Sequence, residues 1–371
     1  MKIYFITQFF RHPTWPYQTG GTISNYNLVK TLALENEVTV LSLESTALPF
    51  SDFETEPFSV VNMKPPEWRG LSLAMYWSGF VQSSVIDLIQ TKGKPDLLIA
   101  TTSTLPALTI LQKMPEVKTW SVVQAYENFG WFPPTVSLSS RIALAKLWFT
   151  HGMKDSSLLR LSDLVITNSV FMRDAICRRF RIDIDKIVII PQLCDVKGGV
   201  SSAPDNTVGF VNRGSDKNLS FVFLLAKNAP ELKFLVFGHT ESILDDYPEN
   251  MAIEGWKSDR TKMFASAKVW IVPSLWAEPF GRVSIEAQAA DRAVLVANVG
   301  GLPETVIDLE FIQSGYRVSD WLTQIKKLMS FKNDKLQANG QRVRETFSQE
   351  SHDNAVFSAL EKTEMRHKDV Q

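Results

Sequence analysis

Two glutamates in the second half of the chain have the spacing of a ligand site. Glu278 and Glu286 lie on either side of Gly281: an apolar run ends at Pro273, a loop carries Glu278, and a helix is expected to begin near Gly281 and include Glu286. The free amides that open such a helix bind anions. A loop carboxylate can accept hydrogen bonds from a polyol, and one within the helix can reach a diol such as a ribose. The same pattern is also typical of a surface loop before a helix whose dipole favours a nearby glutamate.

Two cations precede these glutamates along the chain. Arg213 and Lys217 follow the first apolar run expected for the second half of the chain. Alone, such a pair is typical of an exposed basic turn that opens a helix, so its interpretation depends on the elements around it.

Short apolar runs alternate with helix-length segments along the whole chain. The runs are four to six residues long, rich in β-branched residues and bounded by polar residues, as buried parallel strands are. Those expected in the first half are residues 38–43, 96–100, 119–123, 164–167 and 186–190; those in the second half are 207–211, 233–237, 251–253, 269–272 and 293–297. Alternation of this kind predicts an α/β protein with two doubly wound, Rossmann-like domains.

The domain boundaries follow from composition. The segment 198–206 is rich in Gly, Ser and Pro and is predicted to link an N-terminal domain (1–197) to a C-terminal domain (207–348). Residues 349–371 are expected to form a C-terminal helix and tail that packs back on the N-terminal domain. In open α/β sheets, ligands bind at the carboxyl ends of the strands, so a cleft between the two domains is the expected site.

Composition excludes several classes of protein. Lys plus Arg total 39 and Asp plus Glu total 40, a net charge of −1, which argues against a nucleic-acid binder. Two cysteines supply neither a disulfide framework nor a zinc site and fit a reducing compartment. The amino terminus has a strand pattern rather than a signal peptide, and no stretch has the apolar length of a membrane span. We therefore expect a cytoplasmic protein.

An ordered set of motifs resembles glycosyltransferase family 4, the retaining nucleotide-sugar enzymes with the GT-B fold. The motifs are the signature Glu278-Pro-Phe-Gly-Arg-Val-Ser-Ile-Glu286, Gly20-Gly21 before a helix, Ser162–Ser169, Lys186–Pro191 followed by Asp195, Arg213-x3-Lys217, and Val299–Glu304. The resemblance implies a GT-B architecture in which the first domain binds the acceptor and the second binds a nucleoside-diphosphate sugar.

The same resemblance implies roles for individual residues. Glu278 would bond the hydroxyls of the donor sugar, and Glu286 would bind the ribose. Arg213 and Lys217 would stabilise the leaving diphosphate in place of a metal ion, because two cations suit a group that gains charge as the sugar departs. The amides near Phe280 and Gly281 would assist them, and the other residues implied at the donor are Arg282, Gly20, Gly21 and Gln124.

The implied activity is the transfer of a hexosyl or deoxyhexosyl unit to an acceptor hydroxyl, with retention of configuration and without a metal or other cofactor. The implied acceptor is a glycan, lipid-linked or free, in bacterial surface-polysaccharide synthesis. The nucleotide base and the sugar are not specified by the sequence.

One departure from the family pattern keeps alternatives open. Gln124 aligns with a position where many members have a His, and Gln can hydrogen-bond a hydroxyl but cannot titrate. A non-catalytic GT-B partner subunit is therefore one alternative, and a nucleotide-sugar epimerase or hydrolase on the same fold is another.

Two further segments carry weaker signals. Asp183-Ile-Asp185 matches a metal-binding pattern but precedes a strand, so it is interpreted as structural, and no metal site is predicted. The segment Trp131–Arg160 is aromatic and then amphipathic and basic. It is interpreted as a solvated helix, with peripheral contact to an anionic inner membrane or a lipid-linked acceptor as the alternative.

Overall fold

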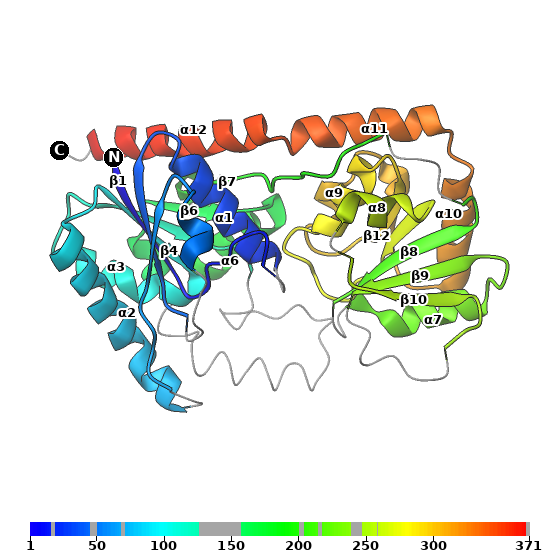
Figure 1. The fold of residues 1–371 in the computed structure, drawn as a ribbon. Helices are drawn as coiled ribbons and strands as arrows, with labels where there is room; N and C mark the ends of the chain where they lie inside the picture. The colour runs from blue at the N-terminus through cyan, green and yellow to red at the C-terminus, as the bar shows by residue number, and fades with distance from the viewer. Residues whose placement is uncertain are drawn as a thin grey trace. The chain divides into compact units, whose positions relative to one another are not determined.

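The computed structural model describes residues 1–15, 19–44, 50–67, 71–125, 157–199, 204–213, 217–238, 247–257 and 259–368. The chain forms two compact units. Of the described residues, unit 1 contains those within 1–125, 157–191 and 352–368, and unit 2 contains those within 192–351. Both are α/β units built on a parallel sheet (Figure 1).

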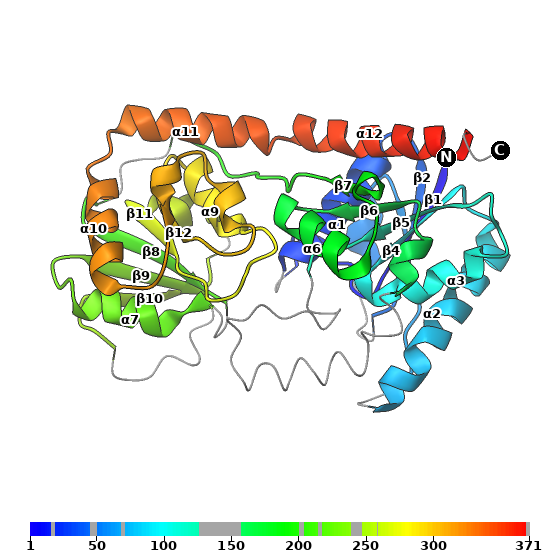
Figure 2. The same cartoon turned by 180° about the vertical axis from the view of Figure 1, so that it is seen from behind.

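Unit 1 contains a seven-stranded parallel sheet in the order β3-β2-β1-β4-β5-β6-β7. Its strands are β1 (Lys2–Thr7), β2 (Glu37–Ser42), β3 (Ser59–Asn62), β4 (Leu97–Thr101), β5 (Lys118–Val122), β6 (Leu164–Thr167) and β7 (Ile187–Ile189). Its helices are α1 (Gly20–Leu32), α2 (Leu71–Lys92), α3 (Leu108–Leu111), α6 (Val170–Phe180) and most of α12 (Gln349–Lys368). Helix α1 lies in front of the sheet in Figure 1 and α6 in front of it in Figure 2, so helices cover both faces.

Unit 2 repeats this plan with six parallel strands in the order β10-β9-β8-β11-β12-β13. The strands are β8 (Thr207–Asn212), β9 (Lys233–Gly238), β10 (Met251–Gly255), β11 (Val269–Val272), β12 (Ala293–Ala297) and β13 (Ile312–Gln313). The helices are α7 (Leu219–Lys227), α8 (Arg260–Ala265), α9 (Arg282–Ala289), α10 (Val318–Met329) and α11 (Asn333–Thr346). Strands β11 and β12 are buried along their whole length, which explains their continuous apolar sequences.

Within the described residues the chain passes between the units at two points, and neither coincides with the predicted linker. It leaves unit 1 after Pro191, and Cys194 and Val196 already belong to the core of unit 2. Residues 198 and 199 also lie in unit 2, where the Gly199 amide donates to Asp291 Oδ2 at 2.6 Å. Burial of these apolar side chains moves the boundary upstream of the Gly- and Ser-rich segment.

The second passage lies inside α12. The helix begins at Gln349 in unit 2, and from His352 onward it belongs to unit 1. Val356, Ala359 and Leu360 are part of the unit 1 core, and Trp120 Nε1 of β5 donates to Thr363 Oγ1 at 2.8 Å. The C-terminal helix thus packs on the N-terminal unit.

Candidate active site

The strand order of unit 2 identifies one place for a ligand. Chain order reverses between β8 and β11, and in doubly wound sheets ligands bind at the carboxyl ends of the strands beside such a switch point. Arg213 directly follows β8, and Ser274 lies two residues beyond the end of β11. Residues from the two predicted motifs therefore meet at one edge of this sheet.

Glu278 and Lys217 form the first pair at this edge. Lys217 Nζ donates to Glu278 Oε1 at 2.6 Å, and Ser274 Oγ donates to the same oxygen at 2.5 Å. Both bonds end on Oε1, and the Glu278 side chain keeps 11 % of its surface exposed. The carboxylate is therefore held by two donors on one oxygen while part of the group still faces outward.

Three glycines fix the loop that carries Glu278. Gly281, the residue that caps α9, has φ +118°, and a Cβ there would lie 2.4 Å from Leu302 Cδ2. Gly300 has φ +59°, and a Cβ on it would lie 2.4 Å from the Glu278 carbonyl oxygen. The Gly301 amide donates to that carbonyl at 2.7 Å. The loop that carries Glu278 and the motif Val299–Glu304 are thus in backbone contact. Only glycine allows so close an approach.

The side chain of Phe280 has a structural role. It is 6 % exposed, and its ring lies 5.6 Å from that of Phe347 in the unit 2 core. Only backbone groups near the start of α9 are therefore expected to contact a ligand at this position, in agreement with the role predicted for the amides near Phe280.

Glu286 is fully buried and paired with two arginines. Arg282, one turn earlier on α9, donates to Oε1 through a terminal nitrogen at 3.1 Å and through Nε at 3.3 Å. Arg260 of α8 donates to Oε2. Arg282 also donates to Gln192 Oε1 at 3.3 Å, which further fixes its guanidinium. Both carboxylate oxygens therefore already have cationic donors.

Arg213 adds a third guanidinium to this region. It lies over the ring of Trp256, 4.5 Å from the ring centroid, and Trp256 is 49 % exposed at the end of β10. Burial, and after it the positive charge of Arg260, lowers the pKa of Arg213 to about 10. Several guanidinium groups thus lie close together at a half-buried edge of the sheet. Such a concentration of positive charge favours the binding of an anion.

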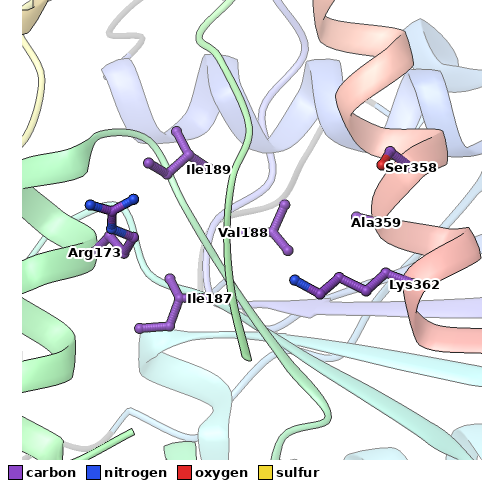
Figure 3. Close-up of a pocket in the computed structure, with 7 residues that line it drawn as sticks. All are labelled: Arg173, Ile187, Val188, Ile189, Ser358, Ala359 and Lys362. Carbon is purple, nitrogen blue, oxygen red and sulfur yellow. The ribbon is translucent and has the colours of Figure 1, made fainter. Parts of the chain in front are cut away.

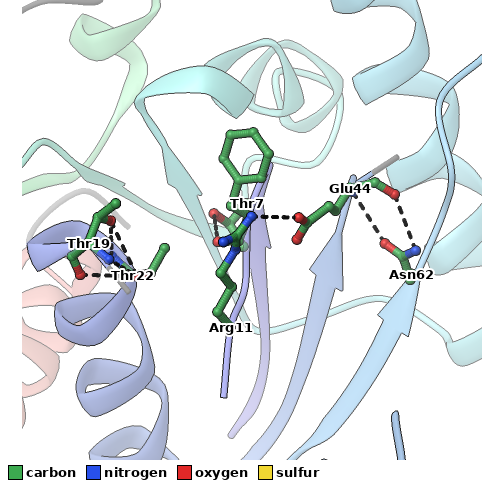
Figure 4. A network of polar contacts seen from close by, with 7 residues as sticks. Thr7, Arg11, Thr19, Thr22, Glu44 and Asn62 are labelled. Atoms are coloured by element: carbon green, nitrogen blue, oxygen red, sulfur yellow. Dashed lines mark hydrogen bonds and ion pairs between the residues drawn. The ribbon is translucent and has the colours of Figure 1, made fainter. Parts of the chain in front are cut away.

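In unit 1, the predicted glycine pair begins a helix. Gly20 and Gly21 are the first two residues of α1, and Thr19 caps the helix through a reciprocal bond pair with Thr22 (Figure 4). Gln124, beyond β5, donates to Ser24 Oγ at 2.8 Å. A Cβ on Gly21 would lie 3.4 Å from Gln124 Oε1, so Gly21 allows the close approach of this side chain.

Gln124 therefore lies beside the glycine pair. Its side chain also donates to Asn25 Oδ1 at 3.2 Å, and its backbone carbonyl accepts from Asn168 Nδ2 at 3.2 Å. These bonds join the ends of β5 and β6 to the second turn of α1. The roles that the sequence analysis assigns to Gly20, Gly21 and Gln124 stay predictions.

The comparisons with known proteins agree with this geometry. Residues 200–345 match the sequence model of a family described as Glycosyl transferases group 1. This segment is a glycosyl transferase group 1 domain. It contains the cation pair, both glutamates, and the glycines that hold the Glu278 loop. The predicted resemblance to a glycosyltransferase family is confirmed.

Curated relatives match over shorter stretches. D-inositol 3-phosphate glycosyltransferase from Mycobacterium sp. (strain KMS) is 38 % identical over 76 residues, which cover 20 % of this chain and 17 % of that protein. The protein of the same name from Mycobacteroides abscessus is 29 % identical over 145 residues, covering 34 % of this chain and 32 % of that protein. The matches thus span from about a sixth to a third of these relatives.

Solved structures match along almost the whole chain. HepE of Anabaena, in complex with UDP, has a TM-score of 0.70 at 17 % identity, and the match covers 97 % of this chain and 100 % of the HepE chain. Sucrose-phosphate synthase from Thermosynechococcus elongatus has a TM-score of 0.70 at 16 % identity, covering 97 % of this chain and 98 % of its own. These likenesses confirm the predicted GT-B architecture of two Rossmann-like domains.

Three residues of the group 1 domain's site were not singled out by the sequence analysis. Arg260 contacts Glu286 from a helix 26 residues away, Ser274 holds Glu278, and Trp256 stacks on Arg213. An aromatic residue three positions beyond the predicted strand 251–253 was the available signal for Trp256. The Arg260 contact has no local sequence signal, because it depends on how α8 packs beside α9.

Other predicted features are outside this site. Among the described residues, no group of three or more His, Cys, Asp or Glu side chains could hold a metal ion. Asp183 caps a single 3-10 turn by accepting from the Asp185 amide at 3.1 Å. No helix in the described part of the chain is both long and apolar enough to span a bilayer. Most of the segment Trp131–Arg160 lies outside the described residues, so its two interpretations stay open.

One surface cavity of unit 1 is separate from all of these residues. It has a volume of about 280 Å³ and lies where the edge strand β7 runs between α6 and α12 (Figure 3). Its lining residues are Arg173, Ile187, Val188, Ile189, Ser358, Ala359 and Lys362. Arg173 is paired with Asp174 at 3.0 Å, and Lys362 is a second cationic side chain beside the apolar residues of β7.

Proposed function

We propose that this protein is a retaining glycosyltransferase that moves a hexosyl or deoxyhexosyl unit from a nucleoside-diphosphate sugar to an acceptor hydroxyl. The observation that carries the proposal is the cation cluster at the switch point of unit 2. Arg213, Arg260 and Arg282 are close enough for their charges to interact, and one buried carboxylate, Glu286, lies among them. A diphosphate is the anion whose charge and size suit such a cluster.

The comparisons support a nucleotide donor. HepE, which shares the fold, was solved with UDP and with UDP-glucose, and the curated relatives are named as glycosyltransferases. UDP is therefore the first nucleotide to test. The acceptor is a glycan of surface-polysaccharide assembly, as the family resemblance implies.

In the proposed reaction, Lys217, Arg213 and the amides at the start of α9 stabilise the leaving diphosphate. Glu278 accepts hydrogen bonds from the donor sugar through its outer face, because its Oε1 is already held by Lys217 and Ser274. A carboxylate fixed in this way is a positioned hydrogen-bond acceptor rather than a covalent nucleophile. The acceptor hydroxyl attacks from the face that the diphosphate leaves, and a departing phosphate oxygen takes its proton. No metal is required, because the cations supply the charge.

Calorimetry against UDP, GDP, ADP and dTDP tests the nucleotide site. We expect one of them to bind and Arg213→Met to weaken its binding at least tenfold, since a charge-assisted contact to phosphate is lost. Arg317→Met is the matched control, because Arg317 is an exposed arginine of the same unit. Absence of binding for all four nucleotides, or equal effects of the two substitutions, would overturn the proposal.

Turnover of the matching sugar nucleotide then tests the reaction. We expect a product with retained anomeric configuration, which NMR of the anomeric proton reports. An inverted product would contradict the retaining mechanism, and nucleotide binding without transfer to any acceptor would favour the non-catalytic alternative.

A further inference from the structure

A second polar network in unit 1 bears on the acceptor. Arg11 follows β1, Glu44 follows β2, and Asn62 is the last residue of β3, so all three lie at the carboxyl edge of adjacent strands. Figure 4 shows the three side chains meeting at this edge. The edge adjoins the switch point between β1 and β4, where ligands of doubly wound sheets bind.

The network is rigid and electrically paired. An Arg11 terminal nitrogen donates to Glu44 Oε1 at 3.0 Å, and Glu44 is only 3 % exposed while Arg11 is 28 % exposed. Asn62 fixes Glu44 by accepting from its amide and donating to its carbonyl, both at 3.3 Å. The Arg11 guanidinium is therefore held in one orientation, and the buried carboxylate of Glu44 neutralises its charge.

The neighbouring cations are paired with carboxylates as well. His12 Nε2 lies 3.4 Å from Glu56 Oε1, and Tyr26 donates to that oxygen at 2.5 Å. Lys30 Nζ lies 3.8 Å from the other Glu56 oxygen. Lys30, like Arg11, thus has an acidic partner, and the His12 ring contacts the same carboxylate as Lys30.

The sequence of the three loops that follow these strands strengthens this charge argument. Between β1 and α1 the charged residues are one arginine and one histidine, between β2 and β3 they are four carboxylates, and between β3 and α2 they are one lysine, one arginine and one glutamate. With the histidine neutral, three cations against five carboxylates give a formal charge of −2. Residues 16–18 and 45–49 add no charged side chain. A phosphorylated ligand at this edge would meet a net acidic surface, which disfavours it.

We infer that Arg11, Glu44 and Asn62 form an acceptor subsite for an uncharged polyhydroxy compound, a sugar or cyclitol without phosphate. The inference rests on the proposed glycosyltransferase function and names the chemical class of its acceptor. Arg11 donates to acceptor hydroxyls, while Glu44 and Asn62 orient it. The names of the curated relatives contain a phosphorylated compound, D-inositol 3-phosphate, so the inferred acceptor differs from that compound in lacking a phosphate.

Paired acceptors test the inference. The panel consists of methyl hexopyranosides with their 6-phosphates and myo-inositol with its 3-phosphate, assayed with the donor identified above. We expect kcat/KM to be at least tenfold higher for the neutral member of a productive pair. Ligand-observed NMR with UDP present measures acceptor binding directly, so the preference is also tested without turnover. A phosphorylated member that binds or reacts better than its neutral parent would overturn the inference.

Variants separate a specific role from general stabilisation. Glu44→Gln removes the counter-ion of Arg11, so we expect the neutral-to-phosphorylated ratio to fall about tenfold. Glu54→Gln removes an exposed carboxylate from the same loop and should leave the ratio within twofold. If Glu44→Gln does not fold, Arg11→Met serves instead and should lower binding of the neutral acceptor. Equal ratios in the Glu44 and Glu54 variants, or an unchanged acceptor affinity in the Arg11 variant, would contradict the assignment.

Calorimetry with UDP on each variant distinguishes the two proposals. Intact UDP binding with a preference for phosphorylated acceptors overturns only the acceptor assignment. Loss of nucleotide binding already in the unmodified protein overturns the proposed function, and the acceptor assignment falls with it.

Discussion

Replacing Glu286 by Gln should destabilise unit 2 far more than replacing Glu278 by Gln, although the two changes are chemically identical. Both oxygens of Glu286 accept from guanidinium groups, and the side chain is fully buried. An amide there must turn its NH2 toward one arginine, so that two donors face each other, and two partly buried arginines lose their counter-ion. Breaking a buried ion pair in this way costs about 3–5 kcal/mol.

Glu278 presents a different case. Lys217 and Ser274 both donate to Oε1, so Gln can keep an oxygen there and turn its NH2 away. The pair is also partly solvated, with 24 % and 11 % of the Lys217 and Glu278 side chains exposed. The expected loss is about 1 kcal/mol, close to that of a partly exposed ion pair.

Urea unfolding measures the difference. With an m-value of roughly 2 kcal/mol/M, the Glu286 variant should lower the midpoint by about 1.5–2.5 M and the Glu278 variant by about 0.5 M. Hydrogen exchange in β11 and β12 assigns the effect to unit 2. Glu254→Gln is the control, because its pair with Lys257 at 3.3 Å is exposed and should contribute almost nothing. A Glu286 variant as stable as this control would refute the argument from burial.

Three other predictions concern activity and location. Glu278→Gln should lower turnover about 100-fold, which is typical of losing one contact to a charge that develops in the transition state. The affinity for UDP should change less than threefold. Comparable losses of turnover and of UDP affinity would contradict a role in the transition state. Activity should persist in EDTA, and loss that Mg²⁺ or Mn²⁺ restores would show that the cations do not replace a metal. In native cells, salt should release any membrane-associated fraction, whereas recovery in the soluble fraction at every salt concentration would exclude peripheral attachment through Trp131–Arg160.

The fold could be predicted from the sequence where burial leaves a local signature. Strands β6, β11 and β12 have the predicted bounds, because strands buried on both faces are continuous apolar runs. Strands β3 and β13 were not predicted. The first is half-exposed and lacks such a run, and the second has only two residues. The position of the domain boundary was displaced because Cys194 and Val196 pack into unit 2 through long-range contacts.

The candidate site also has one part that could be predicted from the sequence and one part that could not. Spacing located Glu278 and Glu286 on a loop and a helix, and the structure places them so. Spacing could not show that Glu286 is enclosed, because Arg260 reaches it from another element and Gln192 reaches Arg282 from the far end of the unit's sequence. Contacts of this kind depend on packing and leave no periodic pattern.

The enclosure of Glu286 leads to a prediction about nucleotide binding. Because Glu286 is fully buried, a ribose can reach it only if one of the arginines that cover it moves. Arg282 is held on the same helix and by Gln192, and its side chain is 14 % exposed, whereas that of Arg260 is 24 % exposed and its Nε is buried without a hydrogen-bond partner in the described structure. Arg260 is therefore the residue expected to move. A crystal structure with bound UDP should show a ribose hydroxyl on Glu286 Oε2 and the Arg260 guanidinium displaced from it. Retention of the Arg260 contact, with the ribose held elsewhere, would show that Glu286 is a structural counter-ion and that the ribose role is wrong.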